Sequence, residues 1–279
     1  MRALAEFAMR GRSYAIGLSM VGAIVPLMSW VSGAIVSLVF LRKGGLDGSI
    51  VLLWTLLPLG LSIYFMGDPS SANAVIGAAI LAYVLRVTVS WELTLATTLV
   101  LSVIASLVFQ YTASDVLILF VNLYIEIQKQ FSVEMTYESA EGQFLGGFAM
   151  LQAYMMFAFL ILARWWQSQL YNPGEFKLEF HQIRVTPIFS SAILILIIAC
   201  VLFGESLSRW MPLLTMPLAV SGLAIVHWIV NYRSLSGAWV LVFYLLLIFF
   251  FQLIYPILTV LALLDGYLNI RQRLLINKV

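Results

Sequence analysis

Long apolar blocks alternate with short clusters of charged residues along the whole chain. A transmembrane helix needs about 20 mainly apolar residues, and a charge at the bilayer centre costs about 2.5–3.5 kcal/mol. The stretches between charges therefore predict membrane spans, and the charge clusters predict their aqueous ends. The simple spans predicted in this way are 49–66, 70–86, 91–109, 144–163, 187–203 and 211–230.

Two further apolar blocks are not simple single spans. The first, 14–41, contains Pro26 and predicts a tight helical hairpin of 14–25 and 29–41. The last, 236–264, contains Pro256. Taken as one span it gives nine crossings and an outer C-terminus, so either Pro256 breaks it into a second hairpin or one earlier assignment is wrong. The basic tail favours the cytoplasmic side. Its basic residues are Arg271, Arg273 and Lys278. We expect an all-α transmembrane bundle with eight to ten membrane segments.

Region 110–143 has a different pattern. Asp115, Asn122, Glu126 and Lys129 recur at helical spacing among apolar residues, and the segment is too short and polar for a span. The pattern predicts an amphipathic helix at 113–130 that lies in the membrane interface. The acidic stretch that follows suits the non-cytoplasmic side. Its carboxylates are Glu134, Glu138 and Glu141.

Region 164–186 predicts a cytoplasmic loop rich in aromatic residues. Trp165 and Trp166 are typical interface anchors, and an Asn-Pro-Gly turn follows Tyr171. The alternation after this turn resembles a strand but is too short to exclude a helix. The loop either covers the helix ends or docks a partner protein. Candidate docking residues are Trp165, Trp166, Tyr171 and Asp265.

A few polar side chains fall within the predicted spans or at their ends. Asn73, Gln152, His227 and Asn231 either form interhelical hydrogen bonds or contribute to a ligand site; His227 and Asn231 share one helix face because they are four residues apart. Asp265 either forms an ion pair with a nearby arginine of the tail or takes part in coupling to a partner.

The composition narrows the functional classes. Only 28 of 279 residues are charged, 62% are apolar, and the net charge is +2, so the chain predicts one membrane domain over 1–279, without nucleic-acid binding. The single Cys200 excludes an intrachain disulfide. The sequence contains no Walker A, GxGxxG, GxSxG or HExxH motif, so we expect neither an enzyme nor a cofactor or metal site. The basic N-terminus followed by an apolar stretch predicts an uncleaved first span with a cytoplasmic N-terminus.

Three segments carry a family resemblance: MRALAEFAMRGR, ARWWQSQLYNPGEFKLEF and LLDGYLNIRQRL. They resemble the YybS-like family of bacterial multi-pass membrane proteins, over nearly the whole chain. The resemblance implies the cytoplasmic membrane of a bacterium and a distant likeness to the substrate-capture subunits of vitamin transporters and to the scaffold protein MreD. It implies no catalytic or binding residues, and likeness of fold says little about function.

Two functions therefore remain open. The first is capture or transport of a small molecule, with the ATPase module borrowed from a partner. The second is a scaffold for other membrane or envelope proteins. Both involve membrane lipids as partners. A polar cavity near 115–143 favours the first function, and a tightly packed bundle without such a cavity favours the second.

Overall fold

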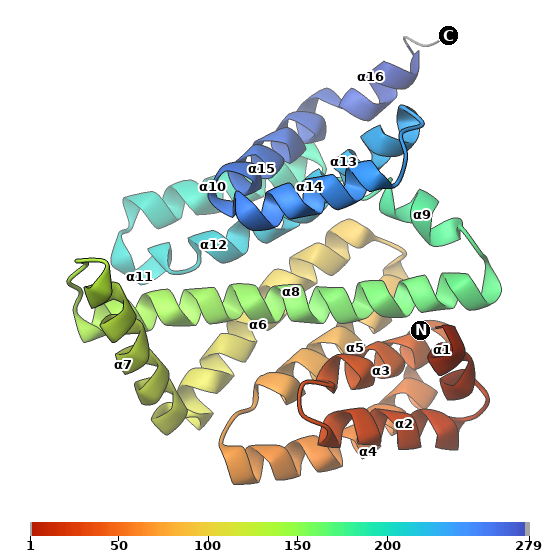
Figure 1. Cartoon of the computed structure of the whole chain (residues 1–279), viewed down its shortest axis with the longest axis horizontal. Helices are drawn as coiled ribbons and strands as arrows, with labels where there is room; N and C mark the ends of the chain where they lie inside the picture. The colour runs from red at the N-terminus through yellow and green to blue at the C-terminus, as the bar shows by residue number, and fades with distance from the viewer. Residues whose placement is uncertain (1, 277–279) are drawn as a thin grey trace. The chain divides into compact units, whose positions relative to one another are not determined.

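The computed structural model describes residues 2–276, and all regular elements in this part of the chain are α-helices (Figure 1). They form two compact units. The first holds the residues up to Gly174 together with Cys200–Leu213, and the second holds Glu175–Ala199 with the residues from Leu214 onward. The helices are α1 (Arg2–Met9), α2 (Arg12–Ile24), α3 (Ser29–Lys43), α4 (Gly45–Met66), α5 (Ser70–Thr88), α6 (Trp91–Thr112), α7 (Ser114–Gln130), α8 (Tyr137–Tyr171), α9 (Glu175–Phe180), α10 (Pro187–Leu202), α11 (Glu205–Ser208), α12 (Met211–Leu214), α13 (Met216–Tyr232), α14 (Ala238–Phe249), α15 (Phe251–Leu268) and α16 (Ile270–Ile276).

Within residues 2–276, six helical stretches are long and apolar enough to cross a membrane, and two further apolar helices, α10 and α14, are shorter. The all-α class is confirmed for the described residues, and such helices are typical of a multi-pass membrane protein. The expected eight to ten segments are not confirmed. The six stretches are α4, α5, α6, α8, Met211–Tyr232 and α15.

The predicted N-terminal hairpin is present as α2 and α3, with the chain turning between them near Pro26. Helix α3 lies at the centre of the first unit, and the side chains from Val31 to Leu41 are all buried. The hydroxyl of Ser32 donates to the carbonyl oxygen of Ser19 at 2.6 Å, which ties α3 to α2. These polar groups are paired inside the protein, as a low-dielectric environment requires.

Small residues allow the central helices of the first unit to approach closely. Ala74, Ala78 and Ala82 of α5 recur at four-residue spacing and are buried, and a Cβ added at Gly77 would overlap Met156 of α8. Similarly, a Cβ at Gly33 of α3 would overlap Phe159 of α8. Such faces drive helix association in lipid, where no hydrophobic effect acts between helices.

Several basic residues of the first unit gather near the C-terminal end of α8. Arg12 pairs with Asp47 at the start of α4, and the guanidinium of Arg42 lies 4.0 Å from the centre of the Tyr171 ring. The guanidinium of Arg86 donates to the last carbonyl groups of α3. In Figure 1, α7 lies beside the opposite end of α8.

Helix α8 is longer than the span predicted at 144–163. It contains 35 residues, which corresponds to about 52 Å at 1.5 Å per residue and exceeds the roughly 30 Å hydrocarbon core. The hydroxyl of Thr136 accepts from the backbone of Ser139 and caps its start. The helix ends before the Asn-Pro-Gly turn, so residues 164–171, which were predicted as loop, are helical.

Helix α7 is the predicted amphipathic helix. Leu117 and Val121 are buried against the rest of the unit. Phe120, Leu123 and Ile127 expose 43%, 45% and 50% of their surface. Because this apolar strip lies between the buried face and the polar face, the helix suits a position at the boundary between lipid and water.

In the second unit, α13 packs against α15. A Cβ at Gly222 would lie 2.5 Å from the carbonyl oxygen of Leu258, so this crossing needs a glycine. The last apolar block breaks at Phe250, between α14 and α15, whereas Pro256 lies inside α15. The prediction that Pro256 divides the block is therefore wrong in position. Lys278 of the basic tail lies outside the described residues.

Candidate functional site

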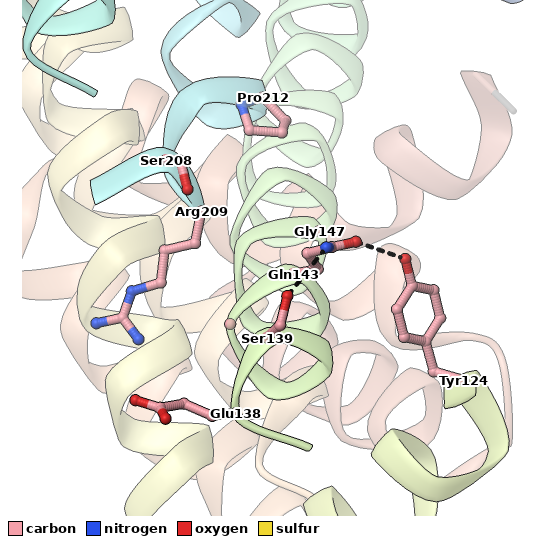
Figure 2. A pocket seen from close by; sticks show the side chains of 9 residues that line it. Tyr124, Glu138, Ser139, Gln143, Gly147, Ser208, Arg209 and Pro212 are labelled. Atoms are coloured by element: carbon pink, nitrogen blue, oxygen red, sulfur yellow. Dashed lines mark hydrogen bonds between the residues drawn. The ribbon is translucent and has the colours of Figure 1, made fainter. Parts of the chain in front are cut away.

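A pocket of about 650 Å³ with polar residues in its lining lies at the N-terminal end of α8 (Figure 2). It lies wholly within the first unit, between the first turns of α8, helix α7 and the segment that follows α11. A volume of this size falls within the usual range for small-molecule sites. The lining residues are Tyr124, Glu138, Ser139, Gly142, Gln143, Gly147, Ser208, Arg209 and Pro212.

One wall of the pocket is held by hydrogen bonds between α7 and α8. The phenol of Tyr124 donates to the amide oxygen of Gln143 at 3.0 Å, and the Gln143 amide nitrogen donates to the Ser139 hydroxyl at 3.5 Å. Figure 2 shows this chain of contacts along one side of the helix. The Tyr124 ring therefore has a fixed orientation at the edge of the pocket.

Glycines shape the floor of the pocket. Gly142 and Gly147 have no other heavy atom within 4 Å of an added Cβ, so their missing side chains leave open space. Gly146 is different, because an added Cβ there would overlap the backbone carbonyl of Arg209. The close approach at Gly146 positions Arg209 beside the open glycines.

Arg209 is the basic group of the pocket. Its guanidinium lies 4.8 Å from the centre of the Trp210 ring, within the range for a cation–π contact. Its Nε is buried and has no hydrogen-bond partner in the described part of the chain. Among the described residues no ion pair joins Arg209 to Glu138, although both line the pocket.

The predicted ligand residues Asn73 and Gln152 lie in the first unit but do not line this pocket. The Gln152 amide nitrogen donates to the carbonyl oxygen of Ser70 at 3.2 Å, and the Asn73 amide donates to that of Ala105 at 3.4 Å. The amide oxygen of Gln152 is buried without a partner among the described residues. Both side chains therefore link neighbouring helices, and their role as ligands stays a prediction.

His227 and Asn231 lie in the second unit. The Nε2 of His227 is 3.0 Å from the Tyr244 hydroxyl, and the imidazole packs edge-on against Phe180. Asn231 is exposed and lines a smaller pocket of about 350 Å³. The four predicted ligand residues thus do not converge on one site.

The same small pocket adjoins a buried ion pair. The guanidinium of Arg271 donates to Asp265 at 3.0 Å and to the carbonyl oxygens of His181 and Ile183. Burial lowers the pKa of His181 to about 4, and the positive charges of Lys177 and Arg271 add to this effect, as does the neighbouring His227. Arg271 therefore fastens the chain before α10 to the end of α15.

The predicted docking residues differ in exposure. Trp166 and Asp265 are fully buried, so they offer no surface to a partner protein. Trp165 is partly buried, and Tyr171 exposes 38% of its surface. The hypothesis of a docking surface is therefore limited to Trp165 and Tyr171.

Sequence reasoning missed most residues of the large pocket. Region 110–143 stood out because of its polarity, and Glu138 was noted only for its charge. Arg209 stands in a short polar segment between two predicted spans, where a basic residue departs from the acidic pattern of region 110–143. No sequence feature marks Tyr124, Ser139 and Gln143 as pocket residues, because their role depends on the contact between α7 and α8.

The fold and the long apolar helices define the chain as a helical bundle of the multi-pass membrane class. No protein-family model matches the chain, and no curated protein or solved structure is significantly similar to it. The resemblance to the YybS-like family therefore stays a prediction.

Proposed function

We propose that this protein captures a small polar molecule at the membrane surface and serves as the membrane component of a transport system. The observation that carries the proposal is the polar pocket between α7, α8 and the segment after α11. A polar cavity near 115–143 favours capture over a scaffold role, and Tyr124 and Glu138 of that region line the pocket.

The charges near the two ends of α8 support an assignment of the pocket to one side of the membrane. The basic cluster of Arg12, Arg42 and Arg86 lies at one end, and basic residues mark the cytoplasmic side. Ser139 is 32 residues from Tyr171 on the same helix, which separates them by about 48 Å. We infer that the pocket faces the non-cytoplasmic side of a bacterial cytoplasmic membrane, with the N-terminus in the cytoplasm.

Energy coupling would come from another protein in this proposal, since the sequence has no nucleotide-binding loop of its own. The partly exposed side chain of Tyr171, in the first unit, offers a cytoplasmic contact for an ATPase partner. The same surface supports the alternative function, a scaffold that organises membrane proteins. A scaffold function does not require this pocket.

The test is native mass spectrometry of the protein released from lipid nanodiscs. We expect a small molecule to remain bound to the wild-type protein and to be lost when Gly142→Trp fills the pocket. Gly60→Trp is the matched control, because Gly60 is also helical with open space around its missing Cβ. Retention of the same molecule by Gly142→Trp, or a wild-type protein that retains none, would contradict capture at this pocket.

A further inference from the structure

Two opposite charges line the large pocket without neutralising each other. Glu138 and Arg209 both contribute to its lining, and no ion pair joins them within the described residues. Figure 2 shows the Arg209 side chain extending toward the end of α8 that carries Glu138. The contacts that hold each side chain in place therefore decide what the pocket can bind.

The backbone of Arg209 cannot move freely toward Glu138. It rests on Gly146, where its carbonyl occupies the place of a missing Cβ, and the guanidinium is held over the Trp210 ring. Its buried Nε has no partner among the described residues. Buried donors are nearly always satisfied, so this nitrogen is suited to an acceptor brought by a ligand.

Glu138 supplies the acidic group of the pocket. It lies in the first turn of α8, where the helix dipole stabilises a carboxylate. The side chain is exposed, so its oxygens remain accessible from the pocket. Neutral polar side chains complete the lining: Ser139 and Gln143 on α8, and Tyr124 on α7.

We propose that the pocket binds a small zwitterion, in which a carboxylate or phosphate group and an ammonium group lie a few bonds apart. The anionic group pairs with the guanidinium of Arg209, and the ammonium group pairs with Glu138. A simple anion would leave Glu138 unpaired and repelled, and a simple cation would do the same at Arg209. Specificity thus comes from the repulsion of singly charged ligands as well as from the attraction of a zwitterion. This inference rests on the proposed capture function.

Two sources can supply such a ligand, and the experiment separates them. The soluble source is represented by the standard amino acids, titrated into wild-type protein in phosphatidylglycerol nanodiscs. The lipid source is represented by nanodiscs that contain phosphatidylethanolamine, with retained lipid counted by native mass spectrometry. Binding in the first arm alone identifies a solute, and enrichment in the second arm alone identifies a headgroup.

Blocking one charge at a time tests the zwitterion directly, without a variant. The N-acetyl and the C-amide derivatives of the amino acid that binds best should each bind about 10- to 100-fold more weakly, because each loses one charge-assisted contact. For the headgroup, N-acylated phosphatidylethanolamine serves as the blocked form. Equal binding of the free and blocked compounds would overturn the proposal.

Single substitutions then test which residue of the pocket binds each charge of the ligand. Arg209→Gln and Glu138→Gln should each weaken binding of the zwitterion by a similar factor. Glu138→Gln should strengthen binding of the N-acetyl compound, because the carboxylate that repels this anion is removed. Lys129→Gln and Glu134→Gln are matched controls, because these charged residues are close in sequence but do not line the pocket. Zwitterion binding that is unchanged in both pocket variants would overturn the proposal. If the protein instead captures a neutral or singly charged molecule that Gly142→Trp expels, the capture function stands and the zwitterion inference fails.

Discussion

Two glycines of α8, four residues apart, should respond in opposite ways to the same substitution. Gly142 has open space where a Cβ would lie, whereas a Cβ at Gly146 would overlap the carbonyl oxygen of Arg209 and lie 3.3 Å from its Cα. These are backbone atoms, so they cannot move aside by a simple side-chain rotation. Comparing Gly142→Ala with Gly146→Ala therefore separates the effect of helix propensity on stability from the effect of packing.

The magnitudes follow from two known costs. Replacing a helical glycine by alanine stabilises the folded state by about 0.5–1 kcal/mol when nothing clashes, so Gly142→Ala should gain up to that amount. Gly146→Ala gains the same propensity but loses about 1–3 kcal/mol to overpacking. We expect Gly146→Ala to be the less stable variant by about 1–3 kcal/mol.

The assay is reversible unfolding of both variants by sodium dodecyl sulfate in mixed micelles, followed by circular dichroism or tryptophan fluorescence. Gly146→Ala should also weaken ligand binding although Gly146 does not line the pocket, because the displaced backbone carries Arg209. Equal stability of the two variants, or a more stable Gly146→Ala, would refute the close approach between α8 and Arg209.

Three further predictions concern single interactions. Asp265→Asn should lower stability by about 3–5 kcal/mol, because it leaves Arg271 buried and unpaired; Asp265→Asn combined with Arg271→Met should recover part of this loss in the same unfolding assay. Because burial lowers the pKa of His181 from 6.5 to about 4, the unfolded chain binds a proton more readily. The stability that neutral His181 contributes is therefore complete above pH 6.5 and falls by up to about 3 kcal/mol as the pH drops to 4. A His181→Gln variant should lack this component of the unfolding pH profile. Arg86→Met should cost about 1 kcal/mol, since it removes donors to the last carbonyl groups of α3, and hydrogen exchange at that helix end should rise.

Helix positions could be predicted well from the sequence, because apolar length and charge clusters are local properties. The hairpin of α2 and α3 and the amphipathic α7 follow from such patterns. The C-terminal end of α8 could not be predicted, because Trp165 and its neighbours are as typical of a loop at the membrane interface as of a helix. The break at Phe250 lies in an apolar run without a nearby glycine, and the nearest polar residue, Gln252, does not by itself mark a helix end.

The pocket could be predicted only as a region. Polar residues in a span look alike in sequence whether they bind a ligand or a neighbouring helix. The sequence therefore pointed to Gln152 as a candidate ligand residue and not to Gln143. In the structure, Gln152 donates to a backbone carbonyl and Gln143 lines the pocket. Arg209 depends on a contact with Gly146, 63 positions away in the chain, and a single sequence carries no signal for such a pairing.

The most direct test of the account is the accessibility of the pocket from outside the cell. The chain has a single cysteine, Cys200, so Cys200→Ala gives a background without thiols. In that background, Ser139→Cys should react with a membrane-impermeant maleimide in intact spheroplasts. Ser13→Cys, an exposed position next to Arg12 in the first unit, should react only after the membrane is opened. If Ser139→Cys stays unlabelled until the membrane is opened, the pocket does not face the non-cytoplasmic side and the proposed capture function is contradicted.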